Sequence, residues 1–154
     1  MHKKNVTTRR KVTGSVPTEH QEGVALMQWA QFHSIARKFL FHIPNGGARA
    51  IATARNLKAE GVKPGIPDYF LPYPSNGRPG LFIELKRQKG GVVSPEQKEW
   101  IRRLKSVGYA VHVAKGWEEC VKIILEYLGD HLSTSSENVI RKMSYGGTTI
   151  SLDF

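Results

Sequence analysis

Two short runs in the middle of the chain hold residues whose types and spacing suit phosphodiester chemistry. The first is Pro67-Asp68, and the second, after fifteen intervening residues, is Glu84-Leu85-Lys86. Residues i and i+2 of a β-strand point to the same face, so the Glu84 carboxylate and the Lys86 ammonium would lie side by side. If Asp68 belongs to the neighbouring strand of a hairpin, its carboxylate also comes next to Glu84.

This cluster of charges suits a divalent cation. Two adjacent carboxylates repel each other unless a cation lies between them, and oxygen ligands favour Mg²⁺ or Mn²⁺. A bound Mg²⁺ lowers the pKa of its waters and supplies a hydroxide that attacks a phosphodiester. Lys86 would position that water or neutralise charge on the phosphorane. Each motif alone is more often a surface ion pair or a turn, but their combination favours a site.

Local patterns predict the strands that carry these residues. Residues 81–86 alternate, so that Ile83 and Leu85 would face away from the two charged side chains. Residues 68–71 predict a second strand, and residues 75–80, Ser-Asn-Gly-Arg-Pro-Gly, are typical of a hairpin connection.

Two capping boxes predict helix starts on either side of the motifs. Thr18 with Gln21 opens a helix expected to reach about Arg37, and Ser94 with Gln97 opens another after the second motif. The other expected elements are strands at residues 39–43 and 109–114, a helix at 48–60 ended by Gly61, and a helix at 117–128 ended by Gly129. In the two helices opened by capping boxes we expect certain positions to be buried. They are Val24, Leu26, Met27, Trp29, Ala30 and Ile35 in the first, and Trp100, Ile101, Leu104 and Val107 in the second.

These elements predict an α/β sandwich with a mixed central sheet flanked by helices. The 154 residues fit one domain. We expect a basic flexible arm at residues 1–16, the folded domain at residues 17–129, and a Ser/Thr-rich linker and C-terminal tail at residues 130–154. Residues 148–154 could add a strand to a sheet or to a partner.

The charge of the chain points to a polyanionic partner. Lys and Arg number 23 against 13 Asp and Glu, which gives a net charge of +10. Residues 1–14 hold five basic residues and no acid, so the remainder carries 18 − 13 = +5. Binding to phosphates releases counterions and supplies affinity. Charge alone does not distinguish a nucleic-acid surface from an ordinary basic one.

Other features of the composition narrow the class of protein. The longest apolar runs are much shorter than the roughly 18 residues of a membrane span, so we expect no membrane association. The single cysteine, Cys120, cannot form an internal disulfide, which favours a reducing, intracellular setting such as the cytoplasm or nucleoid. A phage-encoded protein acting inside its host cell fits the same expectation.

The motifs together resemble the PD-(D/E)XK nuclease superfamily and, in their fuller pattern, its virus-type replication-repair nuclease branch, the VRR-NUC domain. The resemblance covers roughly residues 18–129. Besides Pro67-Asp68 and Glu84-x-Lys86 it rests on Glu19, Pro44-Asn45-Gly46-Gly47 with Arg49, Gly65-Ile66, Ser94-Pro95-x-Gln97 and Gly108-Tyr109.

The resemblance implies a restriction-endonuclease-like fold and a DNA endonuclease that depends on Mg²⁺ or Mn²⁺. Its product would carry a 5′-phosphate and a 3′-hydroxyl. The implied site consists of the metal ligands Asp68, Glu84 and the backbone carbonyl of Leu85, the catalytic basic group Lys86, and the supporting side chains Gln97 and Glu19.

Two of these supporting residues have alternative interpretations. Glu19 and Glu22 lie three apart on one helical face, so either could reach the site, and we favour Glu19 for its place after Thr18. Both also suit the positive end of a helix dipole. Gln97 is explained by its capping box alone as well as by catalysis.

A second group of residues suits DNA phosphates. The Asn-Gly-Gly segment opens a predicted helix whose N–H groups and dipole favour an anion, although a simple turn explains it too. Basic residues after it would extend a DNA-facing surface, or form a solvated helix face. The candidate nucleic-acid-binding residues are Asn45, Gly46, Gly47, Arg49, Arg55, Lys58 and Lys63.

We therefore expect an endonuclease that acts on branched DNA such as four-way junctions or flaps. A symmetric homodimer would present two active sites to a two-fold substrate. One alternative is a non-catalytic nucleic-acid-binding module, which would gain nothing from two acids that face a polyanion. The other is an RNA endonuclease of the same superfamily, which the sequence does not distinguish from a DNA enzyme.

Overall fold

Strand β3 (Leu81–Lys86) lies in the interior of the sheet, and all six of its residues are buried. The computed structural model describes residues 16–44, 57 and 59–129. Within them, β3 pairs antiparallel with β2 (Tyr69–Leu71) and parallel with β4 (Ala110–Lys115). The short strand β1 (Phe41–His42) pairs antiparallel with β2, which gives a mixed sheet in the order β1-β2-β3-β4.

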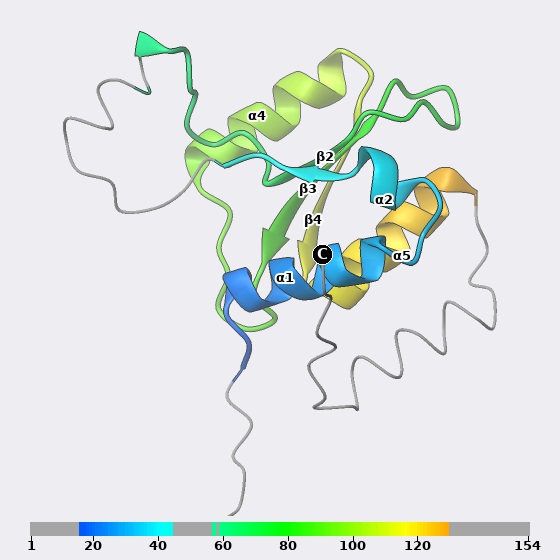
Figure 1. Ribbon diagram of the computed structural model, residues 1–154. Helices are drawn as coiled ribbons and strands as arrows, with labels where there is room; N and C mark the ends of the chain where they lie inside the picture. Colours follow the sequence, from blue (N-terminus) through cyan, green and yellow to red (C-terminus); the bar gives the residue numbers. More distant parts are fainter. Residues whose placement is uncertain (1–15, 45–56, 58, 130–154) are drawn as a thin grey trace, which may run out of the picture.

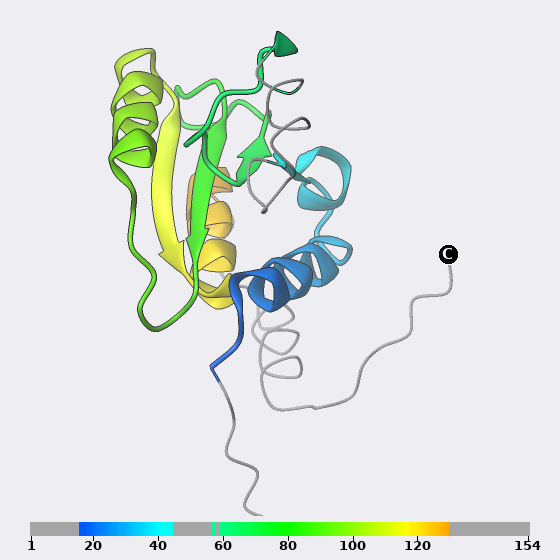
Figure 2. The same cartoon turned by 90° about the vertical axis from the view of Figure 1, so that its left-hand side faces the viewer.

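Helices cover both faces of this sheet (Figure 1). Figure 2 shows α4 (Pro95–Ser106) against one face, with α1 (Glu19–Ala30) and α5 (Trp117–Leu128) on the other. The predicted α/β fold, a mixed central sheet flanked by helices, is confirmed. Among the described helices, none has both the length and the apolar character of a membrane span.

The alternation along β3 sends its side chains to two different cores. Ile83 and Leu85 join the larger core between the sheet and α1 and α5. Phe82 joins a smaller cluster with Leu104 of α4 and Val111 of β4. Because residues i and i+2 of a strand share a face, Glu84 and Lys86 point to the α4 side together with Phe82.

Local signals in the sequence predict most of the observed helix ends. Both predicted capping boxes are present, with Thr18 and Gln21 at the start of α1 and Ser94 and Gln97 at the start of α4. Helix α5 ends at Gly129, whose φ of 73° is the left-handed conformation expected of a C-terminal glycine.

The first helix is shorter than predicted. Helix α1 ends at Ala30 instead of Arg37, and a separate short helix, α2 (Ala36–Phe39), follows a turn. The imidazole of His33 provides a reason, because its Nδ1 accepts the backbone N–H of Ala36 at 3.1 Å. Such a bond from side chain to backbone starts a new helix in place of continuing the old one.

Two positions predicted to be buried are exposed, and one predicted strand is shorter than expected. Val24 is 44% exposed because it lies across the helix from Leu26, and Val107 is 67% exposed because it follows the end of α4. The strand predicted at residues 39–43 shortens to the two residues of β1, since Phe39 belongs to α2.

Some predictions fall on residues outside the described ranges. They include the tail at residues 130–154 and all of the N-terminal arm except Val16. In the helix expected at residues 48–60, Leu57 and Ala59 have helical backbone, and residues 45–56 and 58 lie outside the described part.

The loop before β2 is held against the start of α4 at a glycine. Gly65 has a φ of +85°, and a Cβ atom there would lie 2.7 Å from the backbone carbon of Glu96. Trp100 strengthens this contact, because its Nε1 donates to the Pro64 carbonyl at 3.0 Å. The loop therefore brings the chain that leads to Asp68 beside the first turn of α4.

Replacing Gly65 with alanine should therefore destabilise the domain by about 2 to 4 kcal/mol, the sum of a left-handed backbone cost and a steric overlap. The matched control is Gly61→Ala, since Gly61 has a φ of +88° and a Cβ atom there would have nothing within 4 Å. It should cost about 1 to 2 kcal/mol from the backbone alone. Urea unfolding of both variants measures the difference, and equal losses would contradict the close approach.

Candidate active site

The Asp68 carboxylate is anchored on the main chain of β3. Its Oδ2 accepts the backbone N–H of Leu85 at 2.9 Å. The Asp68 carbonyl in turn accepts the N–H of Ile43, just after β1, at 2.7 Å. The N–H and C=O of one strand residue point toward the same neighbouring strand, so the Leu85 carbonyl is also directed to this side of β3.

The carboxylate of Glu84 is the most confined charged group of the site, with 0% of the residue exposed. Its Oε1 lies 2.7 Å from the Lys86 ammonium and also accepts a hydrogen bond from Gln97 Nε2. Its Oε2 is buried and has no hydrogen-bond partner. The structure therefore brings Asp68, Glu84, Lys86 and Gln97 together, with Asp68 adjacent to the Glu84 carboxyl group.

Gln97 uses different atoms for its two predicted roles. Its Oε1 accepts the N–H of Ser94 at 2.8 Å and its own N–H donates to Ser94 Oγ at 3.2 Å, which closes the capping box. Its Nε2 remains free to donate to Glu84. The two interpretations of Gln97 are therefore compatible, because the box orients the amide toward the carboxylate.

Burial and mutual repulsion shift the acids toward their protonated forms. Burial raises the pKa of Glu84 to about 7; the Lys86 hydrogen bond opposes this shift and the nearby Asp68 charge adds to it. Burial also raises the pKa of Asp68, against the Leu85 N–H and the Lys86 charge, which lower it. For Lys86, burial disfavours the charged form, but the hydrogen bond to Glu84 and the negative charges of Glu84, Glu19 and Asp68 together outweigh this effect and raise its pKa.

The two glutamates of α1 differ in their surroundings. Glu19 is exposed, and its charge raises the pKa of both Asp68 and Lys86, so it lies within electrostatic reach of the site. Glu22 is 1% exposed, and its Oε2 accepts the backbone N–H of Trp117 at 2.9 Å, at the start of α5. Glu22 therefore caps α5, and Glu19 is the glutamate of α1 whose charge acts on Asp68 and Lys86.

The capping role of Glu22 is a contact that the sequence interpretation missed. A signal for it was present, because Glu22 shares the buried face of α1 with Leu26, Trp29 and Ala30. An acid on an apolar helical stripe indicates a buried polar partner. That partner, a main-chain N–H 95 residues away, is not visible in any local pattern.

The predicted nucleic-acid-binding residues lie mostly outside the described ranges. They are Asn45, Gly46, Gly47, Arg49, Arg55 and Lys58. Lys63 is described and exposed, in the loop next to Pro64.

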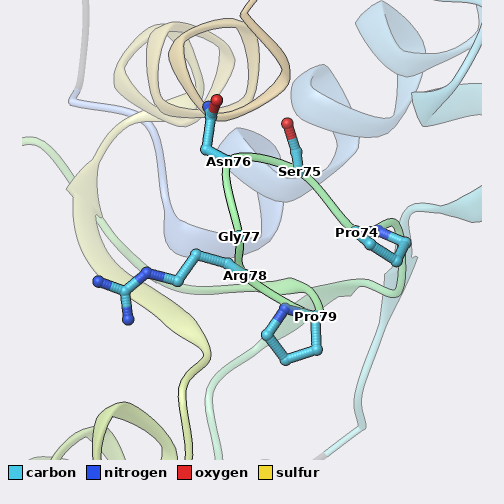
Figure 3. Close-up of a pocket in the computed structure, with 6 residues that line it drawn as sticks. All are labelled: Pro74, Ser75, Asn76, Gly77, Arg78 and Pro79. Carbon is cyan, nitrogen blue, oxygen red and sulfur yellow. The ribbon is translucent and has the colours of Figure 1, made fainter.

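A hollow of about 540 Å³ lies in the loop between β2 and β3, lined by residues 74–79 (Figure 3). Asn76 and Gly77 both have positive φ, 49° and 71°, as in a type I′ turn. Asn76 Nδ2 donates to the Tyr127 carbonyl at 2.9 Å, which fastens the turn to α5. The hollow precedes β3 whereas Glu84 lies near the other end of that strand, so it is separate from the carboxylates.

The arrangement around Glu84 fits a hard divalent cation. The unpartnered Oε2, the Asp68 carboxylate and the Leu85 carbonyl are all oxygen donors, which Mg²⁺ and Mn²⁺ prefer. Across the described residues, no three acidic, histidine or cysteine side chains form a metal-binding group. A cation here would therefore complete its shell with main-chain oxygen and water, as Mg²⁺ commonly does.

Comparison with known families agrees with this geometry. Residues 10–118, which are 109 of the 154, match the VRR-NUC domain. The chain belongs to the VRR-NUC family. A solved structure described as a VRR_NUC domain protein is similar, with a TM-score of 0.66 and 27% identity, over 76% of this chain and 93% of that one. No curated protein matches the chain. The VRR-NUC domain is a nuclease-type domain, which confirms the resemblance noted in the sequence.

The metal-free VRR-NUC domain should lose stability as the pH rises toward neutrality. The pKa of Glu84 is raised from 4.5 to about 7, so between these values the folded state holds a proton that the unfolded state has released. The stabilisation is complete below the unfolded pKa and is lost as the pH rises through about 7, by up to about 3 kcal/mol. Urea unfolding in EDTA from pH 5 to pH 8 measures this slope. Glu84→Gln should remove most of it, and an unchanged slope in that variant would refute the assignment.

Proposed function

We propose that this VRR-NUC protein is a divalent-metal-dependent, structure-selective DNA endonuclease. The observation that carries the proposal is the buried, unpartnered Oε2 of Glu84 beside Asp68, with Lys86 and Gln97 bonded to the other oxygen. Burial of an ionised carboxylate oxygen costs free energy, and a cation bound at this oxygen would offset that cost once the carboxyl has lost its proton. Phosphodiester hydrolysis gives this arrangement a use.

Each side chain has a role that follows from its contacts. Asp68, Glu84 and the Leu85 carbonyl would hold Mg²⁺ or Mn²⁺, which supplies a bound water of lowered pKa for attack on phosphorus. The Lys86 ammonium, 2.7 Å from Glu84 Oε1, neutralises negative charge that develops on the phosphate. Gln97 fixes the Glu84 carboxylate by holding the same oxygen. Glu19 adds a negative charge at the edge of this group.

The proposal includes branched DNA as the substrate and a homodimer as the active species. The net charge of +10 suits a polyanion. A two-fold dimer would place two such sites on a two-fold substrate such as a four-way junction. Cleavage would leave a 5′-phosphate and a 3′-hydroxyl.

A panel of labelled substrates tests this proposal directly. Single-stranded DNA, duplex, flap, four-way junction and RNA are each incubated with Mg²⁺, Mn²⁺ or EDTA. We expect cleavage of branched DNA with either metal and none in EDTA. Cleavage of RNA alone would assign the protein to the RNA endonucleases, and binding without cleavage of any substrate would favour a non-catalytic module.

Removing either carboxylate should abolish cleavage without weakening DNA binding. Asp68→Asn and Glu84→Gln keep side-chain volume but remove a negative charge from a site that faces a polyanion, so affinity for DNA should stay equal or rise. Mg²⁺ should raise the melting temperature of the unmodified protein and not that of either variant, by mass action. Wild-type cleavage by either variant would exclude the assigned site.

Lys86→Met should lower the cleavage rate by about 10²-fold or more, because it removes the charge while keeping most of the packing. Removing one partner of an exposed ion pair lowers the free energy of unfolding by at most about 1 kcal/mol. Lys86 is only 7% exposed, so its pair with Glu84 is not of this kind. The matched control is Lys115→Met, at the exposed position that pairs with Lys86 in β4. Equal rates for the two variants would reduce Lys86 to a structural residue.

A further inference from the structure

The edge of the sheet at β1 exposes aromatic and basic side chains. Phe39 and Phe41 are 40% and 47% exposed, and Arg37, Lys38 and His42 are exposed between and beside them. Residues 32–44 contain no Asp or Glu. We call these five side chains the aromatic strip. Phe41 lies on the α4 face of the sheet with Phe70, whereas Phe39 contacts Tyr73 and His42 contacts Tyr69, and both tyrosines pack with the larger core on the opposite face.

The ring of Phe41 is the exposed end of a row of aromatic rings that crosses the sheet. Phe41 contacts Phe70 edge to face, with ring centroids 5.8 Å apart, and Phe70 stacks on Phe82 at 4.2 Å. The rings occupy paired positions on β1, β2 and β3. This support fixes the Phe41 ring in place, so that binding through it would cost little side-chain entropy.

The same row lies on the face of the sheet that carries the candidate active site. Phe82 and Glu84 are two residues apart on β3, so they share a face about 7 Å apart. Phe41 is two strands away from β3, or about 10 Å. A nucleic acid strand spans these distances within a few nucleotides.

The strip also joins the site through the backbone. The N–H of Ile43, directly after β1, donates to the Asp68 carbonyl at 2.7 Å. The charge of His42 lies close enough to lower the pKa of Asp68. A strand that leaves the active site along β1 would therefore meet Phe41, the member of the strip that shares the face of the site.

We propose that the aromatic strip binds unpaired bases of a DNA branch, with a base stacked on Phe41 and phosphates near Arg37 and Lys38. This inference rests on the proposed function and adds the part of the substrate that the site selects. An unpaired base offers its π-face to an aromatic ring, whereas the faces of paired bases are covered by their neighbours. The basic side chains and the absence of acids suit phosphates, and they disfavour a second copy of this strip as the occupant.

Oligonucleotide binding measured in EDTA, which prevents metal-dependent cleavage, tests whether the aromatic strip binds unpaired bases. Phe41→Leu keeps an apolar side chain but removes the ring. We expect it to weaken binding of a single-stranded oligonucleotide by about ten-fold or more, with duplex binding unchanged. Phe41→Trp should retain the affinity. A 2-aminopurine base in the single strand should be quenched on binding to the unmodified protein and not to Phe41→Leu.

The matched control is Phe32→Leu, the same change at a ring that is 58% exposed in the turn after α1. It should bind both oligonucleotides as the unmodified protein does. Unchanged single-strand binding by Phe41→Leu, or an equal loss on single strand and duplex, would overturn the proposal, and so would a change of oligomeric state in sedimentation. The proposed function is tested separately, by cleavage of branched DNA by the unmodified protein with Mg²⁺. If no cleavage occurs, the binding measurements in EDTA still test the stacking on Phe41.

Discussion

The burial of the Glu84 carboxylate is the constraint on which the rest of the site depends. A charged group without solvent is costly unless hydrogen bonds and opposite charge compensate it. Lys86 supplies the charge from the same strand, and Gln97 supplies a donor from α4. The Gln97 contact requires α4 to begin beside β3, and the loop contact at Gly65 holds it there. The fold therefore satisfies one carboxylate oxygen and leaves the other without a hydrogen bond.

A second buried acid fixes the same end of β3 from the opposite face. Glu22 of α1 accepts the N–H of Trp117, and the neighbouring Gly116 donates its N–H to the Lys86 carbonyl at 2.8 Å. The turn between β4 and α5 thus links α1 to the backbone of Lys86. The other end of β3 follows a type I′ turn that Tyr127 fastens to α5. Rigid attachment at both ends suits a site whose geometry must not change.

The parts of this arrangement that the sequence predicted are those set by residues close together in the chain. Capping boxes, the Asn76-Gly77 turn and the alternation of residues 81–86 each act within a few residues, and the structure agrees with all three. The break after Ala30 depends on one imidazole that accepts a backbone N–H, a competition that helix periodicity does not reveal. The capping of α5 by Glu22 spans 95 residues, so it follows only from the tertiary fold. Sequence thus indicated which side chains meet near Glu84, and the structure added what holds them.

Under the proposed function, the charge balance of the site links the cation to the nucleic acid. Asp68 and Glu84 contribute two negative charges and Lys86 one positive charge, so the group carries a net charge of about −1 when both acids are ionised. The raised pKa of Glu84 adds a proton that a cation must displace. Such a site would hold Mg²⁺ weakly by itself, and a DNA phosphate would supply a further oxygen ligand. Because linkage is reciprocal, bound DNA would strengthen cation binding by the same factor by which the cation strengthens DNA binding. A protein with an excess of basic charge would then become competent for hydrolysis mainly where a phosphate occupies the site.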